Sequence, residues 1–154
     1  MAWWDDIDIG IKVERTIDPM VITASPGDPF FTIAGGMVLL TGLIGIIDVA
    51  PGGAQTISFE LNPDVGAGAD CVLCTPTNIT TATLEDVITI SGDPTDALIN
   101  GHLQSNLMFE DAPNGIALAP GVLGFVATAA LGEAHWIIWY KPVDDGAAVT
   151  VVGP

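Results

Sequence analysis

The clearest strand signal in the chain is the stretch Thr56-Ile57-Ser58-Phe59-Glu60-Leu61. Its apolar side chains alternate with polar ones, and a period of two residues is typical of a half-buried β-strand. The turn signal Pro51-Gly52-Gly53 precedes it, which places the start of the strand close to Thr56. This stretch therefore predicts β structure, and the rest of the chain repeats the same pattern.

Short strand-like segments separated by turn residues continue in both directions from this stretch. The segment 37–49 fits either a strand buried on both faces or a bent strand with Gly42 and Gly45 at bulges. Short strands with almost no helix between them predict an all-β protein, a single-domain β-sandwich or jelly roll. The other segments with this pattern are 9–17, 30–33, 71–75, 83–91, 116–119, 122–129, 133–141 and 147–152.

The length of 154 residues suits one domain. We expect an extended N-terminal arm over residues 1–10 and a β-sandwich or jelly-roll domain over residues 11–154. The sequence predicts at most one short helix, after Gly92, because Asp93 is a suitable N-cap and Pro94 suits the first helical position. Gly101 follows soon after and would keep such a helix short.

The charge of the chain excludes several classes of partner. Nineteen acidic residues stand against three basic ones, a net charge of −16. This charge repels phosphate backbones and anionic lipid, so we expect neither nucleic acid nor a membrane as partner. The apolar stretch 33–50 contains several glycines and Asp48, which predicts buried strands rather than a membrane helix. The first residues, Met1 to Asp6, have neither the basic start nor the apolar region of a signal peptide.

Half of the chain is apolar, 49% of its residues, although it is so acidic. Either a neighbouring molecule covers some of this apolar surface, or the protein has a large core and a surface rich in small residues. The two tryptophans of the arm either pack on the chain's own core or anchor it to a neighbour, and on the second interpretation Trp3, Trp4 and Ile7 are the candidate anchors to a partner, because tryptophan is enriched at binding hot spots. The candidate residues of a subunit interface are Lys12, Arg15, His135 and Trp139.

The residues that carry chemistry are few. Cys71 and Cys74 form a single Cys-x-x-Cys motif, for which buried free thiols are the favoured interpretation over a redox or zinc site. The two histidines, His102 and His135, accompany no nucleophile motif, and His135 shares one face of a strand with Ile137 and Trp139. We therefore predict no catalytic residue, cofactor or metal. A calcium site remains an open alternative, because Asp6-x-Asp8-x-Gly10 resembles the start of a calcium loop without its distal glutamate.

Several longer motifs resemble those of a known class of proteins. They lie in order between residues 30 and 150, and they resemble small β-rich virion proteins of tailed bacteriophages. The motifs are Gly36-Met-Val-Leu-Leu-Thr-Gly-Leu-Ile-Gly, Phe59-Glu-Leu-Asn-Pro, Asp70-Cys-Val-Leu-Cys, Ile88-Thr-Ile-Ser-Gly-Asp-Pro-Thr-Asp-Ala-Leu and Trp136-Ile-Ile-Trp-Tyr-Lys-Pro-Val-Asp-Asp-Gly-Ala.

The resemblance implies a structural, non-enzymatic component of a bacteriophage virion. Within that class it implies a capsid decoration (cement) protein, a homotrimer that binds the major capsid protein on the outer capsid surface after synthesis in the host cytoplasm. Its motifs are packing and turn motifs, so a tail or fibre protein is an alternative. A third hypothesis is a jelly-roll module that stacks glycans on Trp3, Trp4 or Trp139. An enzyme would need His135 or His102 beside a carboxylate in a cleft.

Overall fold

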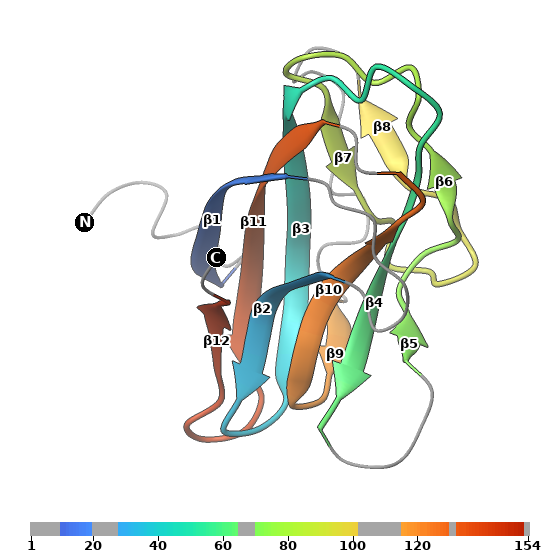
Figure 1. Cartoon of the computed structure of the whole chain (residues 1–154). Coiled ribbons are helices and arrows are strands. Elements are labelled where there is room, and N and C mark those ends of the chain that lie inside the picture. The colour runs from blue at the N-terminus through green and yellow to red at the C-terminus, as the bar shows by residue number, and fades with distance from the viewer. Residues whose placement is uncertain (1–9, 20–27, 65–69, 102–114, 130–131, 153–154) are drawn as a thin grey trace.

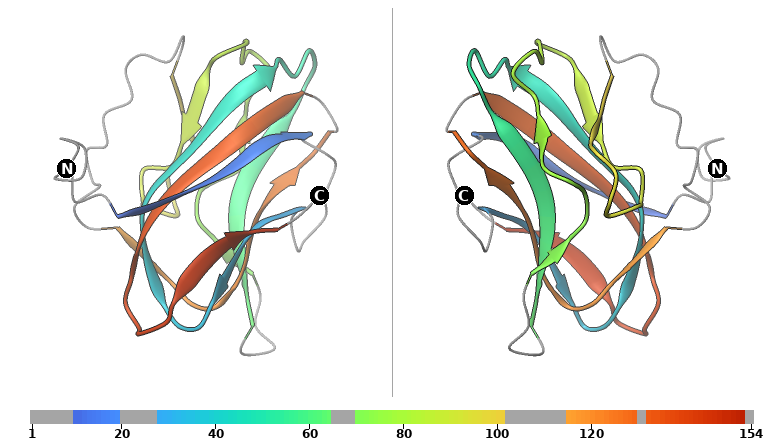
Figure 2. Two further views of the ribbon diagram at one scale, coloured as in Figure 1. Left: turned by 90° about the vertical axis from the view of Figure 1, so that its left-hand side faces the viewer. Right: turned by 90° about the vertical axis from the view of Figure 1, so that its right-hand side faces the viewer.

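Two antiparallel β-sheets form the protein in a computed structural model that describes residues 10–19, 28–64, 70–101, 115–129 and 132–152. Sheet A has the strand order β1-β11-β3-β7-β8, with β9 also paired to β3. Sheet B has the order β12-β2-β10-β4-β5, with β6 also paired to β4. The two sheets stack face to face, as Figures 1 and 2 show. The strands are β1 (Ile11–Pro19), β2 (Asp28–Ala34), β3 (Val38–Val49), β4 (Thr56–Pro63), β5 (Cys71–Val72), β6 (Thr77–Asn78), β7 (Val87–Thr89), β8 (Ile99–Gly101), β9 (Ile116–Leu118), β10 (Gly121–Ala127), β11 (Glu133–Pro142) and β12 (Ala148–Val151).

The all-β prediction is confirmed, and the two packed antiparallel sheets agree with a β-sandwich. The jelly roll, the finer of the two predicted architectures, stays a prediction. Both sheets contribute to one hydrophobic core. No helix occurs among the described residues, and so none of them forms a helix long and apolar enough to cross a membrane.

The expected helix start at Asp93 is wrong within the described chain. The Asp93 carboxylate accepts a hydrogen bond from the backbone N–H of Thr95 (2.8 Å), and the Asp93 carbonyl accepts one from Asp96 (3.1 Å). These bonds close a single turn, a local alternative that aspartate offers to a helix. The turn ends because Ala97 forms an isolated parallel β-bridge with Thr75, after which the chain enters β8.

Alternation along β11 selects which side chains enter the core. Trp136 and Ile138 are buried between the sheets, whereas Ile137 and Trp139 are half-buried on the outer side. The ring of Trp136 contacts rings from sheet B, and the closest of these is Phe59, whose centroid lies 5.2 Å away in an edge-to-face arrangement. Phenylalanines 30 and 125 contact the same indole, with centroids at 5.5 and 5.8 Å. Such aromatic pairs contribute about 0.5–1.5 kcal/mol each beyond the area they bury.

Bulges adjust both sheets to this core. On β2 the pairing with β10 shifts by one residue at Phe30, so the adjacent side chains Phe30 and Phe31 are both fully buried.

On β3 a second shift leaves Thr41 between two paired residues, next to Gly42. A bulge beside Gly42 was one of the two expectations for this strand. Gly45 lies directly opposite Trp136 without a bulge, so its role differs from the expected one.

Gly45 makes room for the indole of Trp136. A Cβ atom at this glycine would lie 2.1 Å from Cζ3 of the ring, far inside van der Waals contact. We predict that Gly45→Ala lowers the free energy of unfolding by about 1–3 kcal/mol, the usual cost of overpacking a core. Denaturant unfolding measures the change. As a control, Leu84→Ala removes a side chain that is 57% exposed and should change stability by less than about 0.5 kcal/mol. Equal stability of Gly45→Ala and the wild type would contradict this packing.

Candidate functional site

The outer side of sheet A carries a strip of large apolar side chains that the sheet itself leaves partly exposed. Ile137 and Trp139 project from β11, and they lie opposite Ile44 and Gly42 of β3. The strip arises from simple alternation, since the neighbours of these residues on both strands face the core. We call this strip the sheet A face, and its half-buried apolar members are Leu39, Ile44, Ile46, Ile137 and Trp139.

The corresponding side of sheet B is more polar. Thr32 of β2 is paired with Thr150 of β12, and Ser58 and Glu60 alternate with core residues along β4. The larger apolar residues described on this side are valines, Val122 and Val126 of β10 and Val72 of β5, which is paired with Glu60. Of the two outer sides, the sheet A face therefore offers the larger apolar side chains to another molecule.

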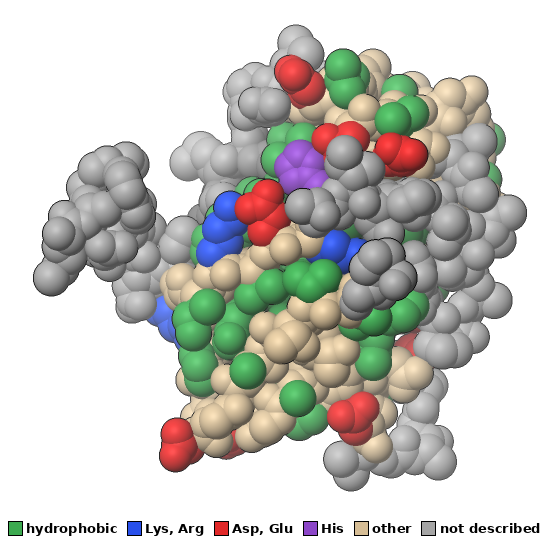
Figure 3. Space-filling view, turned by 60° about the vertical axis from the view of Figure 1, so that its left-hand side comes forward, with side chains coloured by type: hydrophobic (Ala, Val, Ile, Leu, Met, Phe, Trp, Pro, Cys, Tyr) green, Lys and Arg blue, Asp and Glu red, His purple; other side chains and the backbone are tan. Residues whose placement is uncertain are grey.

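Charged side chains border the sheet A face and are paired with one another. Lys12 donates a 2.7 Å hydrogen bond to the Glu14 carboxylate. The Nδ1 atom of His135 lies 2.8 Å from Oδ2 of Asp48 on β3. The hydrogen bond and positive charge of Lys12 lower the pKa of Glu14 below its ordinary value, and His135 adds a smaller effect in the same direction. Figure 3 shows acidic, basic and histidine side chains gathered in one band beside apolar ones.

The basic residues of the chain are concentrated on this side of the fold. All three lie on two neighbouring strands, Lys12 and Arg15 on β1 and Lys141 on β11. Two of them, Lys12 and Lys141, lie on the outer side, which is therefore closer to neutral than the chain as a whole, whose net charge is −16. The described charged side chains of the outer side are Lys12 and Lys141 together with Glu14, Asp48 and Glu133, with His135 among them.

The predicted interface residues thus divide into two groups. Lys12, His135 and Trp139 lie together on the outer side of sheet A, as the alternation pattern indicated. Arg15 lies on the inner side and is 9% exposed. Its guanidinium donates a 2.7 Å hydrogen bond to the carbonyl of Pro29 in β2, and so connects β1 of sheet A to β2 of sheet B. This contact gives Arg15 a role within the domain.

The predicted anchor residues Trp3, Trp4 and Ile7 lie outside the described residues. His102 and the calcium-like stretch from Asp6 to Asp8 lie outside them as well. Within the described ranges, no group of three or more histidine, cysteine or acidic side chains is placed to hold a metal ion.

His135 does lie beside a carboxylate, which is one half of the arrangement that an enzyme would need. Its pair with Asp48 is on the outer side of a sheet, and neither residue lines the cavity described below. A second pair of acids, Asp144 and Asp145, is exposed in the turn between β11 and β12. There the Asp144 carboxylate accepts a 2.7 Å hydrogen bond from the backbone N–H of Met37. This bond joins the turn between β11 and β12 to the turn between β2 and β3.

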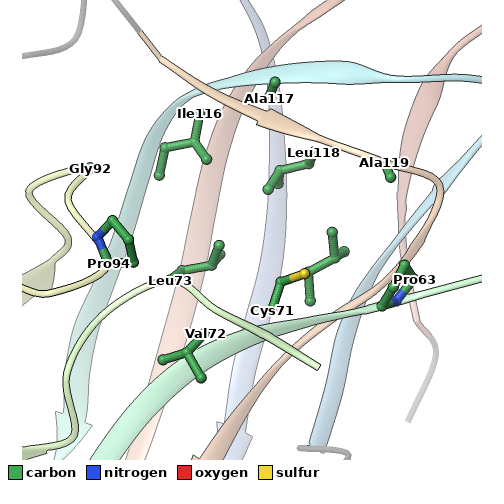
Figure 4. A pocket seen from close by; sticks show the side chains of 11 residues that line it. Pro63, Cys71, Val72, Leu73, Gly92, Pro94, Ile116, Ala117, Leu118 and Ala119 are labelled. Atoms are coloured by element: carbon green, nitrogen blue, oxygen red, sulfur yellow. The ribbon is translucent and has the colours of Figure 1, made fainter. Parts of the chain in front are cut away.

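An apolar cavity of about 320 Å³ opens at the other edge of the sandwich, between β9 of sheet A and β5 of sheet B (Figure 4). Leu73, Leu118 and Ile116 form much of its wall, and Pro94 from the turn after β7 lies at one side. Sequence reasoning missed this cavity because its wall comes from separate segments with no common motif. The lining residues are Leu61, Pro63, Cys71, Val72, Leu73, Gly92, Pro94 and Ile116 to Ala119.

Cysteine placement differs in part from the prediction of two buried thiols. Cys74 is buried and its sulfur accepts a hydrogen bond from the backbone N–H of Phe59 (3.3 Å), whereas Cys71 is exposed. The reason is that β5 is a short edge strand of sheet B, so the Cys71 side of it is uncovered. Burial raises the pKa of the Cys74 thiol, and the hydrogen bond from Phe59 opposes this only in part.

Comparison of the chain with protein-family models, with curated proteins and with solved structures found no match.

The two thiols should differ sharply in reactivity. We predict that a disulfide reagent such as Ellman's reagent modifies Cys71 rapidly in the folded protein at pH 8. Cys74 should react only after unfolding, because a raised pKa leaves less thiolate at a given pH and burial blocks access. Absorbance of the released thiolate counts the reacting groups. Cys71→Ser should abolish the rapid phase, and a rapid phase that persists in this variant would contradict the assignment.

Proposed function

We propose that this chain is a structural component of a bacteriophage virion, a capsid decoration protein. In this proposal it binds the outer shell as a homotrimer and stabilises contacts between capsomers. The observation that carries the proposal is the sheet A face, an apolar strip with a nearly neutral border on an otherwise strongly acidic protein. The resemblance of its motifs to small β-rich virion proteins supports the same role.

The strand order supports the finer expectation of a jelly roll. Successive strands β1, β2, β3 and β4 alternate between sheets A and B, and late strands return between them, β11 beside β1 and β10 beside β2. The paths β1-β11-β3-β7 and β2-β10-β4-β5 resemble the two four-stranded halves expected of a jelly roll. Jelly rolls are common in viral capsid and lectin domains.

Local charge explains why copies of the chain would meet at the sheet A face. Two molecules with a net charge of −16 repel each other, and the repulsion is weakest where acids and bases are balanced. Apolar side chains at the centre of that region supply attraction when they leave water, at about 25 cal/mol per Å² of buried apolar area. Contact through this face therefore costs less electrostatic energy than contact elsewhere.

A trimer would then stabilise the shell through many weak contacts. Each copy adds contacts that exist only in the assembled particle, and bound copies stabilise that state by mass action. Joining three binding sites in one trimer raises the effective concentration of the second and third sites. The acidic remainder of the surface would keep decorated particles apart in solution.

A glycan-binding module is the second candidate, because Trp139 is half-buried on an outer sheet surface close to polar groups of Lys12 and Glu14. Such an aromatic ring beside hydrogen-bonding groups could stack on a sugar. This candidate would be favoured over decoration by two results together. The protein would bind selected glycans on an array and lose that binding in Trp139→Ala, and it would not bind purified shells.

The first prediction from this proposal concerns self-association. Ile137→Glu places a carboxylate in the centre of the sheet A face and should convert the trimer to monomers, which multi-angle light scattering measures. Val143→Glu is the matched control, since Val143 is 57% exposed beside the turn between β11 and β12, and this variant should stay trimeric. Monomeric wild-type protein at high concentration would contradict the proposal. So would an unaltered trimer in Ile137→Glu.

The second prediction concerns the arm. Deletion of residues 1–8 should abolish co-sedimentation with purified shells, because the candidate anchors Trp3, Trp4 and Ile7 are removed. Circular dichroism should remain that of a folded β domain, since the two described sheets share one hydrophobic core. Unchanged occupancy of the shells would contradict an anchoring role for the arm.

A further inference from the structure

The cavity between β5 and β9 has an apolar wall and is large enough for one bulky side chain. None of its described lining residues is charged, and Leu61, Leu73 and Leu118 are buried beside it. Its volume is about 320 Å³. An engineered protein cavity of only about 150 Å³ is large enough to bind benzene. The cavity therefore has room for one aromatic or branched aliphatic side chain.

Three aspartates adjoin this apolar wall. Asp64, Asp70 and Asp93 are each next in sequence to a residue that lines the cavity. The backbone N–H of Asp64 donates a 2.9 Å hydrogen bond to the carbonyl of Pro120, in the turn between β9 and β10. The Asp93 carboxylate accepts hydrogen bonds from the hydroxyl and the N–H of Thr95 (2.7 and 2.8 Å), and these bonds lower its pKa below the ordinary value. Asp93 is therefore ionised at neutral pH.

The basic residues of the chain are too far away to balance these acids. All three, Lys12, Arg15 and Lys141, lie on β1 and β11. The nearest to the cavity in strand order is Lys141, which is opposite Leu39 of β3, and Leu39 in turn is opposite Ala117 of β9. A whole strand thus separates Lys141 from the cavity. The region around the cavity is therefore negative, and it attracts cationic groups and repels anionic ones.

The strands on the two sides of the cavity are edge strands. β5 is the last strand of sheet B, and β9 pairs only with β3 among the described strands. In Figure 4 the labelled residues of β9 lie on one side of the cavity, and those of β5 lie on the other. An edge strand presents unpaired backbone groups, with which an extended segment of another chain can form hydrogen bonds. Every second side chain of such a segment points to the same side.

We propose that this cavity binds an extended segment of another protein, in which lysine or arginine flanks one aromatic or branched apolar side chain. The apolar side chain fills the cavity, and the backbone of the segment pairs with an edge strand beside it. The basic side chains lie against Asp64, Asp70 and Asp93. The site shares no residue with the sheet A face, and it does not depend on the proposed function.

Titration of the isotope-labelled full chain with a short peptide, followed by two-dimensional NMR, tests the site directly. The probe is the pentapeptide Lys-Thr-Phe-Thr-Lys with both ends capped. Backbone amides of residues 71–73 and 116–119 should shift, because these residues line the cavity. Replacing the phenylalanine by serine, or both lysines by glutamate, should weaken binding about tenfold or more. The first change removes the apolar side chain, and the second introduces repulsion.

Three results of this titration would overturn the proposal. The first is the absence of any shift at millimolar peptide. The second is a set of shifts confined to the sheet A face or to another part of the described surface. The third is equal affinity for the lysine and glutamate peptides, or for the phenylalanine and serine peptides.

A variant of the chain tests whether the peptide occupies the cavity itself. Ala119→Trp places a large ring at an exposed position of the cavity wall and should weaken binding of the phenylalanine peptide about tenfold or more, equivalent to ~1.4 kcal/mol or more. Ala50→Trp is the matched control, because Ala50 is exposed after β3 and does not line the cavity. Unaltered binding by Ala119→Trp would count against occupation of the cavity and overturn the proposal.

A second variant tests the charges and leaves the apolar wall intact. Asp64→Asn combined with Asp93→Asn changes only exposed side chains and keeps their hydrogen-bond acceptors, so the fold should be unchanged. It should weaken peptide binding about threefold or more at low salt, and less at high salt, because salt screens exposed charges. Asp145→Asn removes an exposed charge from the turn between β11 and β12 and should bind like the wild type. Equal effects of the double variant and this control would overturn the role of the aspartates.

Discussion

The packing of one indole between two sheets is the constraint on which the rest of the structure depends. Trp136 is fully buried, and its ring touches phenylalanines from three strands of sheet B. Gly45 on the neighbouring strand leaves the space that the ring occupies. The Nε1 atom of this indole has no hydrogen-bond partner among the described residues, so the ring is held by its packing rather than by a polar contact. Its position sets which side of β11 faces inward.

The outer surface of sheet A is determined by which side of β11 faces the core. Because β11 alternates strictly, burial of Trp136 and Ile138 places Ile137 and Trp139 outside, opposite Ile44 and Gly42 of β3. The same alternation on β1 places Lys12 outside and Arg15 inside. One packing arrangement thus produces both the apolar strip and its paired charges.

Local pattern alone determined the all-β character, the strand at residues 133–141 and the placement of His135 with Trp139, because alternation depends only on neighbouring residues. It failed after Gly92, where the Asp93 side chain closes a turn, and at residues 83–91, where only Val87–Thr89 pairs as a strand. Tertiary structure decided the burial of both Phe30 and Phe31, since a bulge depends on the register with β10. It also decided that Arg15 reaches Pro29 and that Cys71 borders a cavity. These features join residues far apart in the chain, and only the packing of the two sheets brings them together.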